Sequence, residues 1–421
     1  MSLVQTFGVI KSNFKLKPKE YTIDNWAFKM HYKATVLFFL VSTILVTSRQ
    51  YIGEHIRCIA DGGVPAHVIN TFCFFTSTFT VPYVNMTKEM ADKLEIEVKH
   101  LDAKLIDSGG LAHPGVGPYG INSTEPVKRH AYYQWVPFVL FGQAICFYLT
   151  HLLWKKMEGG RIRYIVDGLK LAAFALQEKE LQSGGKTIPS KKDKEEKIKK
   201  LREFFLKRVY INNFWSYKLI GIEVLNFLHV ILQIYITNKF LSGNFRQLGS
   251  EVWSEGLDSS VDVLDEVFPK ITKCTFHKYG PSGSIQLHDA MCVMALNIIN
   301  EKIYVALWFW FLFLFIASLA AVLWRFLTLA LHARSVQFNR MVFGVNSPGK
   351  LNPWDTLTVT RHCNFSDWLF LSYLAKNLDS MVFREIFVGL AEEIEGKKPN
   401  KERLLNESDG EVDPDATLKA S

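Results

Sequence analysis

The sequence of 421 residues is poor in the residue types that mark specialised scaffolds, with 26 glycines, 14 prolines and six cysteines. So few glycines and prolines exclude a collagen-like chain and a low-complexity chain. Six cysteines in a chain of this length exclude a small disulfide-rich scaffold. Hydrophobic residues make up 48% of the chain. That fraction excludes disorder as the main state, because so much apolar surface has to be buried.

The sequence also lacks the motifs of common enzyme sites. Residues 115–120 have the glycine spacing of a dinucleotide fingerprint, but Pro118 interrupts it and no strand precedes it. Residues 184–187 resemble the end of a phosphate-binding loop, but Glu180 stands where the first glycine is needed. No His-Glu-x-x-His, Gly-x-Ser-x-Gly or Cys-x-x-Cys motif occurs. We therefore predict no catalytic residue, no metal site and no cofactor.

The hydrophobic residues gather in four windows. A helix that crosses a bilayer needs about 20 consecutive, mostly apolar residues. The sequence predicts four such transmembrane helices, at residues 30–48, 137–154, 219–238 and 303–324. The last window carries five aromatic side chains that suit a position facing lipid: Trp308, Trp310, Phe311, Phe313 and Phe315. The expected fold is an all-α membrane protein with four transmembrane helices.

Lysine and arginine are distributed unevenly between the segments that connect these spans. The loop at 155–218 has 17 basic and 8 acidic residues, whereas the loops at 49–136 and 239–302 have a slight acidic excess. Basic residues favour the cytoplasmic side of a membrane, so we expect the latter two loops to be extracellular. No cleavable signal peptide is expected, and the first span would act as an anchor. The segments expected in the cytoplasm are residues 1–29, 155–218, 325–390 and the variable tail 391–421.

Four of the six cysteines lie in the two loops expected outside the cell: Cys58, Cys73, Cys274 and Cys292. An oxidising exterior favours disulfides, and four cysteines allow three pairings between which the residues alone do not choose. Cys146 and Cys363 are expected to be packed or free thiols. Two sequons in the first loop, at Asn85 and Asn122, are candidate N-glycosylation sites.

The net charge of +8 arises largely in the 155–218 loop, whose most basic stretch is Lys191–Lys200. The plain interpretation is a solvated cytoplasmic helix with alternating charges. A second interpretation is attraction to anionic membrane lipid at the inner leaflet. No aromatic or base-reading pattern accompanies the charge, so nucleic acid is not expected as a partner.

The third span carries four polar side chains with spacings of three, three and four residues: Glu223, Asn226, His229 and Gln233. On a helix that advances 100° per residue they occupy an arc of about 120°. Polar groups are costly in hydrocarbon, so this stripe must face either a water-filled pore or neighbouring helices, and both remain open. A single four-helix bundle fills its own centre with side chains. A conducting protein of this kind should therefore be a ring of subunits.

A five-residue motif opens the second span, made of Tyr132, Tyr133, Gln134, Trp135 and Val136. It resembles the signature of the innexins, the invertebrate gap-junction proteins, which are related to the pannexins. Further stretches with the same resemblance lie at residues 47–53, 112–118, 153–155, 158–160, 274–284 and 300–304. The resemblance covers about residues 1–390 and falls at matching places between and within the spans.

The resemblance implies a four-span channel subunit with a helical cytoplasmic domain after the fourth span. It implies disulfides between the two outer loops, here Cys58–Cys292 and Cys73–Cys274. Innexin subunits form ring-shaped hemichannels, so the expected partners are further copies or other innexin subunits, in an octamer. Hemichannels of adjacent cells dock end to end at a gap junction, and ions and small metabolites pass between the cells. The segments implied to line the pore are Ser2–Lys15 and Ala34–Gln50.

Some features leave other functions open. Glycans at Asn85 and Asn122 would hinder docking, which favours an unpaired plasma-membrane hemichannel that releases small solutes such as ATP. A four-span adhesion protein without a pore is a third interpretation, although tetraspanin-like proteins gather their cysteines in one loop. The chain also departs from the family in the second span, where Phe147–Thr150 lacks the usual proline. A kink at this point, which such a proline would cause, is therefore in doubt.

Overall fold

The computed structural model describes most of the chain in two compact units. We call residues 27–152 with 225–320 the sheet unit, and residues 1–26, 153–224 and 321–421 the helical unit. The residues that the structure describes are 21–52, 55–60, 63–81, 115–116, 127–166, 169, 181–183, 186–188, 190–207, 213–255, 263–346 and 351–396. The pore segment expected at Ser2–Lys15 and the sequons at Asn85 and Asn122 lie outside these ranges.

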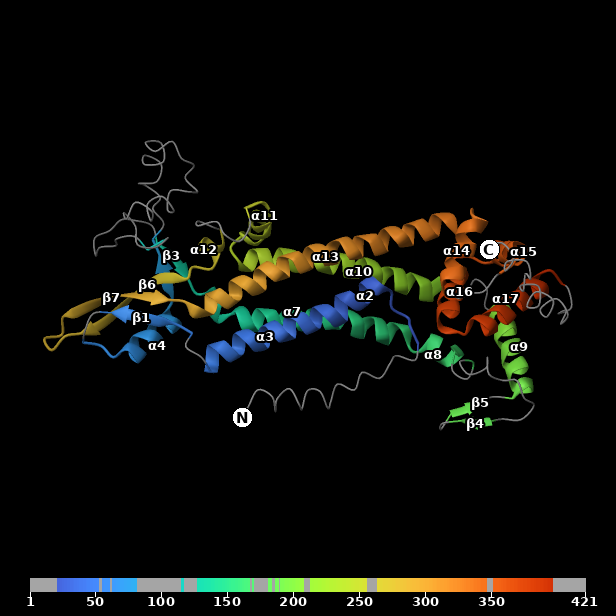
Figure 1. The fold of residues 1–421 in the computed structure, drawn as a ribbon, viewed down its shortest axis with the longest axis horizontal. Helices are drawn as coiled ribbons and strands as arrows, with labels where there is room; N and C mark the ends of the chain where they lie inside the picture. The colour runs from blue at the N-terminus through green and yellow to red at the C-terminus, as the bar shows by residue number, and fades with distance from the viewer. Residues whose placement is uncertain are drawn as a thin grey trace, which may run out of the picture. The chain divides into compact units, whose positions relative to one another are not determined.

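Within the ranges just given, four helices are long and apolar enough to cross a membrane, as expected: Trp26–Ile52, Val136–Glu158, Phe214–Phe240 and Ala295–Leu331. The first consists of α2 (Trp26–Lys29), a π-helical segment (Met30–Ala34) and α3 (Thr35–Ile52). The others are α7 (Val136–Glu158), α10 (Asn213–Phe240) and α13 (Ala295–Leu331), shown in Figure 1. α7 runs without interruption through the positions that lack the usual proline.

The helices extend beyond the apolar windows because protein contacts satisfy their polar ends. α13 starts eight residues before the expected boundary, where the side-chain amide of Asn297 donates to the carbonyl of Pro269 at 2.9 Å. α7 extends to Glu158, whose carboxylate accepts the backbone N–H groups of Gly160 and Ile162 at 2.6 and 3.0 Å. Hydropathy alone does not detect such turns, because they are polar.

The four spans pack around an aromatic centre within the sheet unit. The ring of Phe39 on α3 lies 5.6 Å from Phe147 on α7 and 6.1 Å from Phe311 on α13, measured between centroids. Phe311 is only 1% exposed, so the expectation that it faces lipid was wrong. A helix that carries aromatic residues on all sides still has one face toward its neighbours, and Phe311 is on that face.

The π-helical segment Met30–Ala34 shifts which side chains of the first span lie on the same face of the helix. The hydroxyl of Thr35 donates to the carbonyl of Met30 at 3.0 Å and accepts the indole N–H of Trp310 at 2.9 Å. Such single-turn π segments interrupt α-helices, frequently at functional positions. Here the segment includes His31, which is buried.

The loops between the spans of the sheet unit form an antiparallel sheet that the sequence did not predict. Its strand order is β1-β7-β6-β2-β3. The strands are β1 (Arg57–Ala60), β2 (Thr78–Thr80), β3 (Lys128–His130), β6 (Ile271–Tyr279) and β7 (Ile285–Val293). Among the described residues of these loops, three helices accompany it: α4 (Ala66–Thr76), α11 (Phe245–Glu255) and α12 (Val263–Val267).

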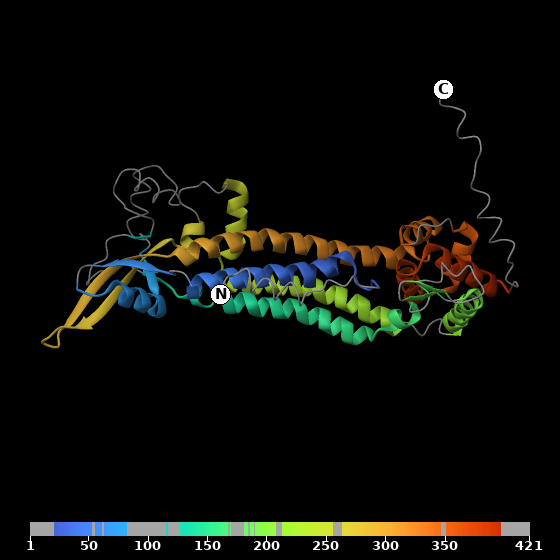
Figure 2. The same cartoon turned by 60° about the horizontal axis from the view of Figure 1, so that its bottom comes forward.

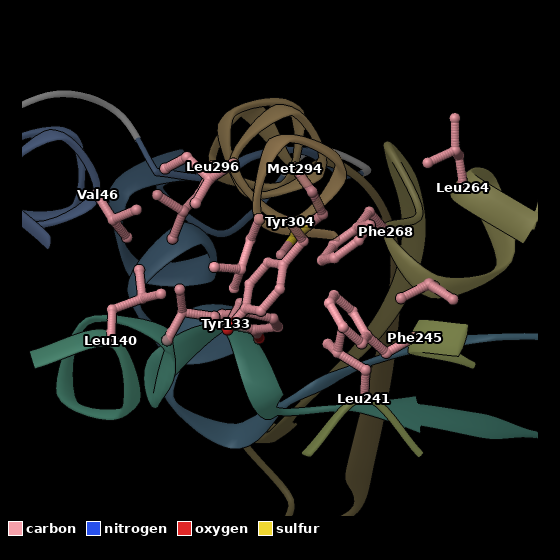
Figure 3. Close-up of a cluster of buried hydrophobic side chains, with 14 of the residues drawn as sticks. Val46, Tyr133, Leu140, Leu241, Phe245, Leu264, Phe268, Met294, Leu296 and Tyr304 are labelled. Carbon is pink, nitrogen blue, oxygen red and sulfur yellow. The ribbon is translucent and has the colours of Figure 1, made fainter. Parts of the chain in front are cut away.

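A cluster of buried apolar side chains joins this sheet to the spans (Figure 3). Tyr304 of α13 lies near its centre, with its ring 5.5 Å from Phe268 and 6.5 Å from Phe245 between centroids. Tyr133 and Leu140 reach the cluster from the start of the second span. The cluster therefore fixes the sheet to the ends of the helices within this unit.

The helical unit has its own core around Trp368. The indole ring lies 6.3 Å from Phe338, 6.0 Å from Phe343 and 6.0 Å from Phe365 between centroids. The helices of this unit are α8 (Arg161–Val166), α9 (Lys191–Lys207), α14 (Val336–Asn346), α15 (Pro353–His362), α16 (Phe365–Asn377) and α17 (Ser380–Ile394). A two-stranded hairpin, β4 (Leu181–Ser183) and β5 (Lys186–Ile188), precedes α9.

Candidate functional site

Two disulfides bind the two loops of the sheet unit together. Cys58 of β1 is bonded to Cys292 of β7, and Cys73 of α4 is bonded to Cys274 of β6. These are the pairings that the resemblance implied. Each bond joins the first loop to the second, so that the two loops form one covalently closed surface. Three of the sulfur atoms lie within 4.8 Å of one another, but their bonds to sulfur leave no thiolate for a metal ion.

The two remaining cysteines are free thiols. Cys363 is buried in the helical unit, and this burial, together with nearby Asp367, raises the pKa of its thiol to about 12. A thiol with such a pKa is protonated and unreactive at neutral pH. Cys146 is exposed on α7.

Side chains of the family signature, residues 132–136, hold in place the helix that carries Cys73. The hydroxyl of Tyr133 donates to the carbonyl of Phe74 at 3.2 Å, and the side-chain amide of Gln134 donates to the same oxygen at 2.6 Å. The Gln134 amide also donates to the carbonyl of Phe75 at 3.2 Å. The last carbonyls of a helix have no partner within the helix. The signature therefore satisfies the end of α4, next to the disulfide.

The signature also contributes buried aromatic surface. Burial raises the pKa of Tyr133 to about 12 and that of Tyr132 well above its usual value, so both hydroxyls stay neutral. Trp135 is exposed, and its ring lies 6.1 Å from Phe138, the next exposed aromatic side chain of α7. Trp135, which precedes α7, suits the aromatic belt at a membrane surface.

The β6–β7 hairpin projects beyond the rest of the sheet (Figures 1 and 2). β1 pairs only with residues 290–293 of β7, and β2 meets β6 at Lys273. The outer half of the hairpin is thus paired only with itself within the described sheet. It carries three exposed apolar side chains, Tyr279, Ile285 and Leu287. Exposed apolar residues and open strand edges are typical of a protein-binding surface.

In the third span, His229 and Gln233 belong to a chain of polar contacts within the sheet unit. The amide of Gln143 on α7 donates to Gln233 Oε1 at 3.1 Å, and Gln233 Nε2 lies 3.1 Å from His229 Nε2. His229 Nδ1 lies 3.2 Å from Nε2 of His31 in the first span. This chain links three spans. The sequence did not indicate Gln143 or His31, because each is an isolated polar residue in its window.

Glu223 precedes His229 by six residues in the sequence and forms a buried ion pair in the helical unit. Arg325 of α13 donates from Nε at 2.7 Å and from Nη2 at 2.6 Å to the two carboxylate oxygens. The side-chain amide of Asn25 also donates to Glu223, at 2.9 Å. The pair therefore links two spans and the start of the first one. Asn226, the remaining member of the stripe, is buried.

The chain that precedes the first span is held by the helical unit. Asn377 of α16 and the backbone of Thr22 bond in both directions, and the Asn377 amide donates to the carbonyl of Thr22 at 2.8 Å. The guanidinium of Arg163 lies 5.9 Å from the ring centroid of Tyr21. These contacts hold Tyr21 and Thr22 in place within the helical unit.

The basic stretch at 191–200 forms most of α9, which packs one face against α17. Lys194 pairs with Glu385 at 2.8 Å and Arg202 with Glu393 at 2.9 Å. Gly389 allows the close approach, because an added Cβ would overlap the guanidinium of Arg202. The other lysines of this helix are exposed.

Comparison with known proteins adds an independent result. The innexin family model matches residues 24–394. Innexin inx7 of Drosophila melanogaster is 45% identical over 398 residues, which cover 93% of this chain and 85% of the relative. Innexin inx2 of Schistocerca americana is 39% identical over 400 residues, or 94% of this chain and 99% of the relative. Innexin inx2 of Drosophila melanogaster is 38% identical over 397 residues, or 94% and 97%.

Proposed function

Because the chain belongs to the innexin family, it is a subunit of gap-junction channels, and we propose that eight copies form a ring that docks with a ring on the adjacent cell. Gap-junction channels in the plasma membrane pass ions and small metabolites between cells. Other innexin subunits can replace some of the copies in the proposed ring. The innexins are a channel family, and we propose no catalytic, metal-dependent or cofactor-dependent step.

The disulfide-bonded sheet is the observation that supports docking. Two disulfides and five strands turn the two loops into one surface, from which the β6–β7 hairpin projects. A flexible loop would lose conformational entropy on docking, whereas this surface is already ordered. The exposed side chains of Tyr279, Ile285 and Leu287 give it apolar contacts for the opposite ring.

The same sheet supports the proposed orientation of the chain. Disulfides persist outside the cell and are reduced in the cytosol, so the loops with the disulfides, 49–136 and 239–302, are extracellular. The basic loop 155–218 and the helices α14–α17 are then cytoplasmic, which agrees with the excess of basic residues in that loop.

We infer that the pore is lined by the N-terminal segment and the first span. The polar stripe of the third span supports this choice indirectly. Glu223, His229 and Gln233 all bond to other spans of the same chain. Their polar groups are thus satisfied within the bundle and do not need water. Thr22 and Asn25, which precede the first span, are bonded to Asn377 and Glu223 within the helical unit.

Electrical coupling between paired cells that lack other junction proteins tests the function directly. We expect current between the cells that depends on expression of this chain in both of them. Membrane current in single cells without coupling in pairs would instead establish an unpaired hemichannel. An unchanged gel mobility after endoglycosidase treatment would then exclude glycans at Asn85 and Asn122 as the obstacle to docking. The mass of the purified ring gives the number of subunits, which we expect to be eight.

A further inference from the structure

A groove runs between the first and fourth spans of the sheet unit. Its volume is about 690 Å³, and its walls are almost entirely apolar. α3 contributes Leu37, Val41 and Leu45, and α13 contributes Ala306, with Lys302 near the start of α13. An apolar hollow of this size in a membrane helix bundle must be filled by lipid or by protein.

The exposed side of α7 has a shape that complements the groove between α3 and α13. Its exposed side chains recur at spacings of three and four residues: Phe138, Phe141, Ile145, Tyr148 and Leu152. An adjoining face of the helix is buried in the bundle through Leu140, Ala144 and Phe147. A row with this spacing forms a ridge of the kind that packs into the groove between two other helices.

The ridge and the groove lie at the same depth. The rings of Phe147 on α7 and Phe311 on α13 are in contact, with centroids 6.3 Å apart. Both helices begin at the sheet and rise about 1.5 Å per residue. Phe141 therefore lies about 9 Å, and Ala306 about 7.5 Å, nearer the sheet than this contact. A rotation about the channel axis preserves depth, so Phe141 of one copy reaches the level of Ala306 of the next.

A cation and an aromatic ring are available to each other at the end of the groove that is nearer the sheet. Lys302 precedes Phe311 by nine residues, as Phe138 precedes Phe147, so these two side chains share one level. The Lys302 side chain is 64% exposed. Its ammonium group pairs with Glu301 at 2.7 Å and, being exposed, can in addition lie over the ring of Phe138 from a neighbouring copy, a cation–π contact that becomes stronger when it is desolvated.

We propose that the α7 ridge of one copy packs into the α3–α13 groove of the next copy around the ring. The contact joins two different surfaces of the same chain, as a closed ring with rotational symmetry requires. The inference rests on the proposed ring and specifies which helices meet at each subunit boundary.

Disulfide cross-linking in the full-length channel tests this contact. The background is Cys146→Ser, which removes the exposed thiol of α7. One tagged chain carries Ala306→Cys and a second chain with another tag carries Phe141→Cys. After mild oxidation we expect a reducible band of twice the chain mass that contains both tags.

Tyr235→Cys on α10 replaces Phe141→Cys in the matched control. Tyr235 is also an exposed aromatic residue, and it follows His229, a neighbour of Phe147, by six residues, so it lies at a similar depth. This pair should give no band. A band with Tyr235→Cys and none with Phe141→Cys would overturn the proposal, because the third span would then fill the groove. If rings of normal mass give no cross-linked band with either pair of cysteines, the proposal is overturned, and lipid fills the groove instead.

Ring mass and coupling between cells are measured for the same variants. A failure of the proposed function can then be told apart from a failure of the proposed helix contact. If intact rings fail to couple cells, the docking proposal fails while the cross-linking result still stands. A second variant, Ala306→Trp, fills the groove and should reduce the yield of rings by more than half. Tyr235→Trp should leave that yield unchanged. Normal ring assembly by Ala306→Trp would contradict the contact.

Discussion

Glu223 and Arg325 form an ion pair in which both side chains are almost completely removed from solvent. Two charges in such a place are tolerated only because the geometry is bidentate and Asn25 adds a third hydrogen bond. The pair connects the third span to the fourth and to the start of the first. At this position a single carboxylate on the third span thus binds the fourth span and the residue that precedes the first.

Removing one partner should leave the other charge buried without compensation. We expect Glu223→Leu to lower the free energy of unfolding by about 3–5 kcal/mol, the usual cost of breaking a buried pair. The double variant Glu223→Leu with Arg325→Met should recover most of that loss, because no charge remains. Denaturation of the purified protein in detergent measures both values. Equal losses in the single and double variants would show that the charge pair is not the cause.

His130 in β3 should make the sheet sensitive to acid. Burial, and to a lesser extent the nearby ammonium of Lys128, lowers the pKa of its imidazole to about 4, from about 6.5 in the unfolded chain. The folded state therefore favours the neutral ring, and its contribution is complete above pH 6.5. It is lost as the pH falls from 6.5 to 4, a total on the order of 3 kcal/mol.

The measurement is the free energy of unfolding at several pH values between 7 and 4. His130→Gln should flatten the curve in this range, because glutamine does not titrate. The same slope in the variant and the parent would assign the acid sensitivity to other groups.

At the scale of elements, the spans could be predicted from the sequence and the sheet could not. A run of apolar residues is a local signal, and four such runs led to four helices. β1, β2 and β3 are only three or four residues long, and β1 pairs with residues far along the chain, such as Arg57 with Val293. The polar site was predictable in part. Glu223 and His229 were recognised, but their partners Arg325 and His31 come from other spans, and no local pattern connects them.

Gly249 permits the close packing of α11 on α13. An added Cβ would overlap the indole ring of Trp308. We expect Gly249→Ala to displace α11 and to lower the free energy of unfolding by about 1–3 kcal/mol, the usual cost of overpacking. Gly221→Ala on α10 is the matched control, because its Cβ meets no atom within 4 Å. That change should be neutral or stabilising, since alanine favours a helix. Equal effects of the two substitutions would refute the packing argument.

At the scale of the whole molecule, the disulfides decide whether a ring can dock. Cys58→Ser or Cys292→Ser should abolish coupling between paired cells, since losing a native disulfide typically costs about 2–5 kcal/mol. Cys146→Ser removes a free thiol and should leave coupling intact. The readout is junctional current, with surface expression of each variant verified by labelling. Normal coupling by either disulfide variant would contradict the role assigned to the sheet.

The number of residues between the bonded cysteines also determines when each disulfide can form during synthesis of the chain. Cys58 and Cys292 are separated by 234 residues, and Cys73 and Cys274 by 201. A ribosome that adds about 5–20 residues per second needs roughly 10 to 50 s to make such an interval. In the proposed orientation, the first loop enters the oxidising lumen with unpaired thiols during that time, while two further spans are made. Protection of these early thiols is therefore a task for the secretory machinery of the cell.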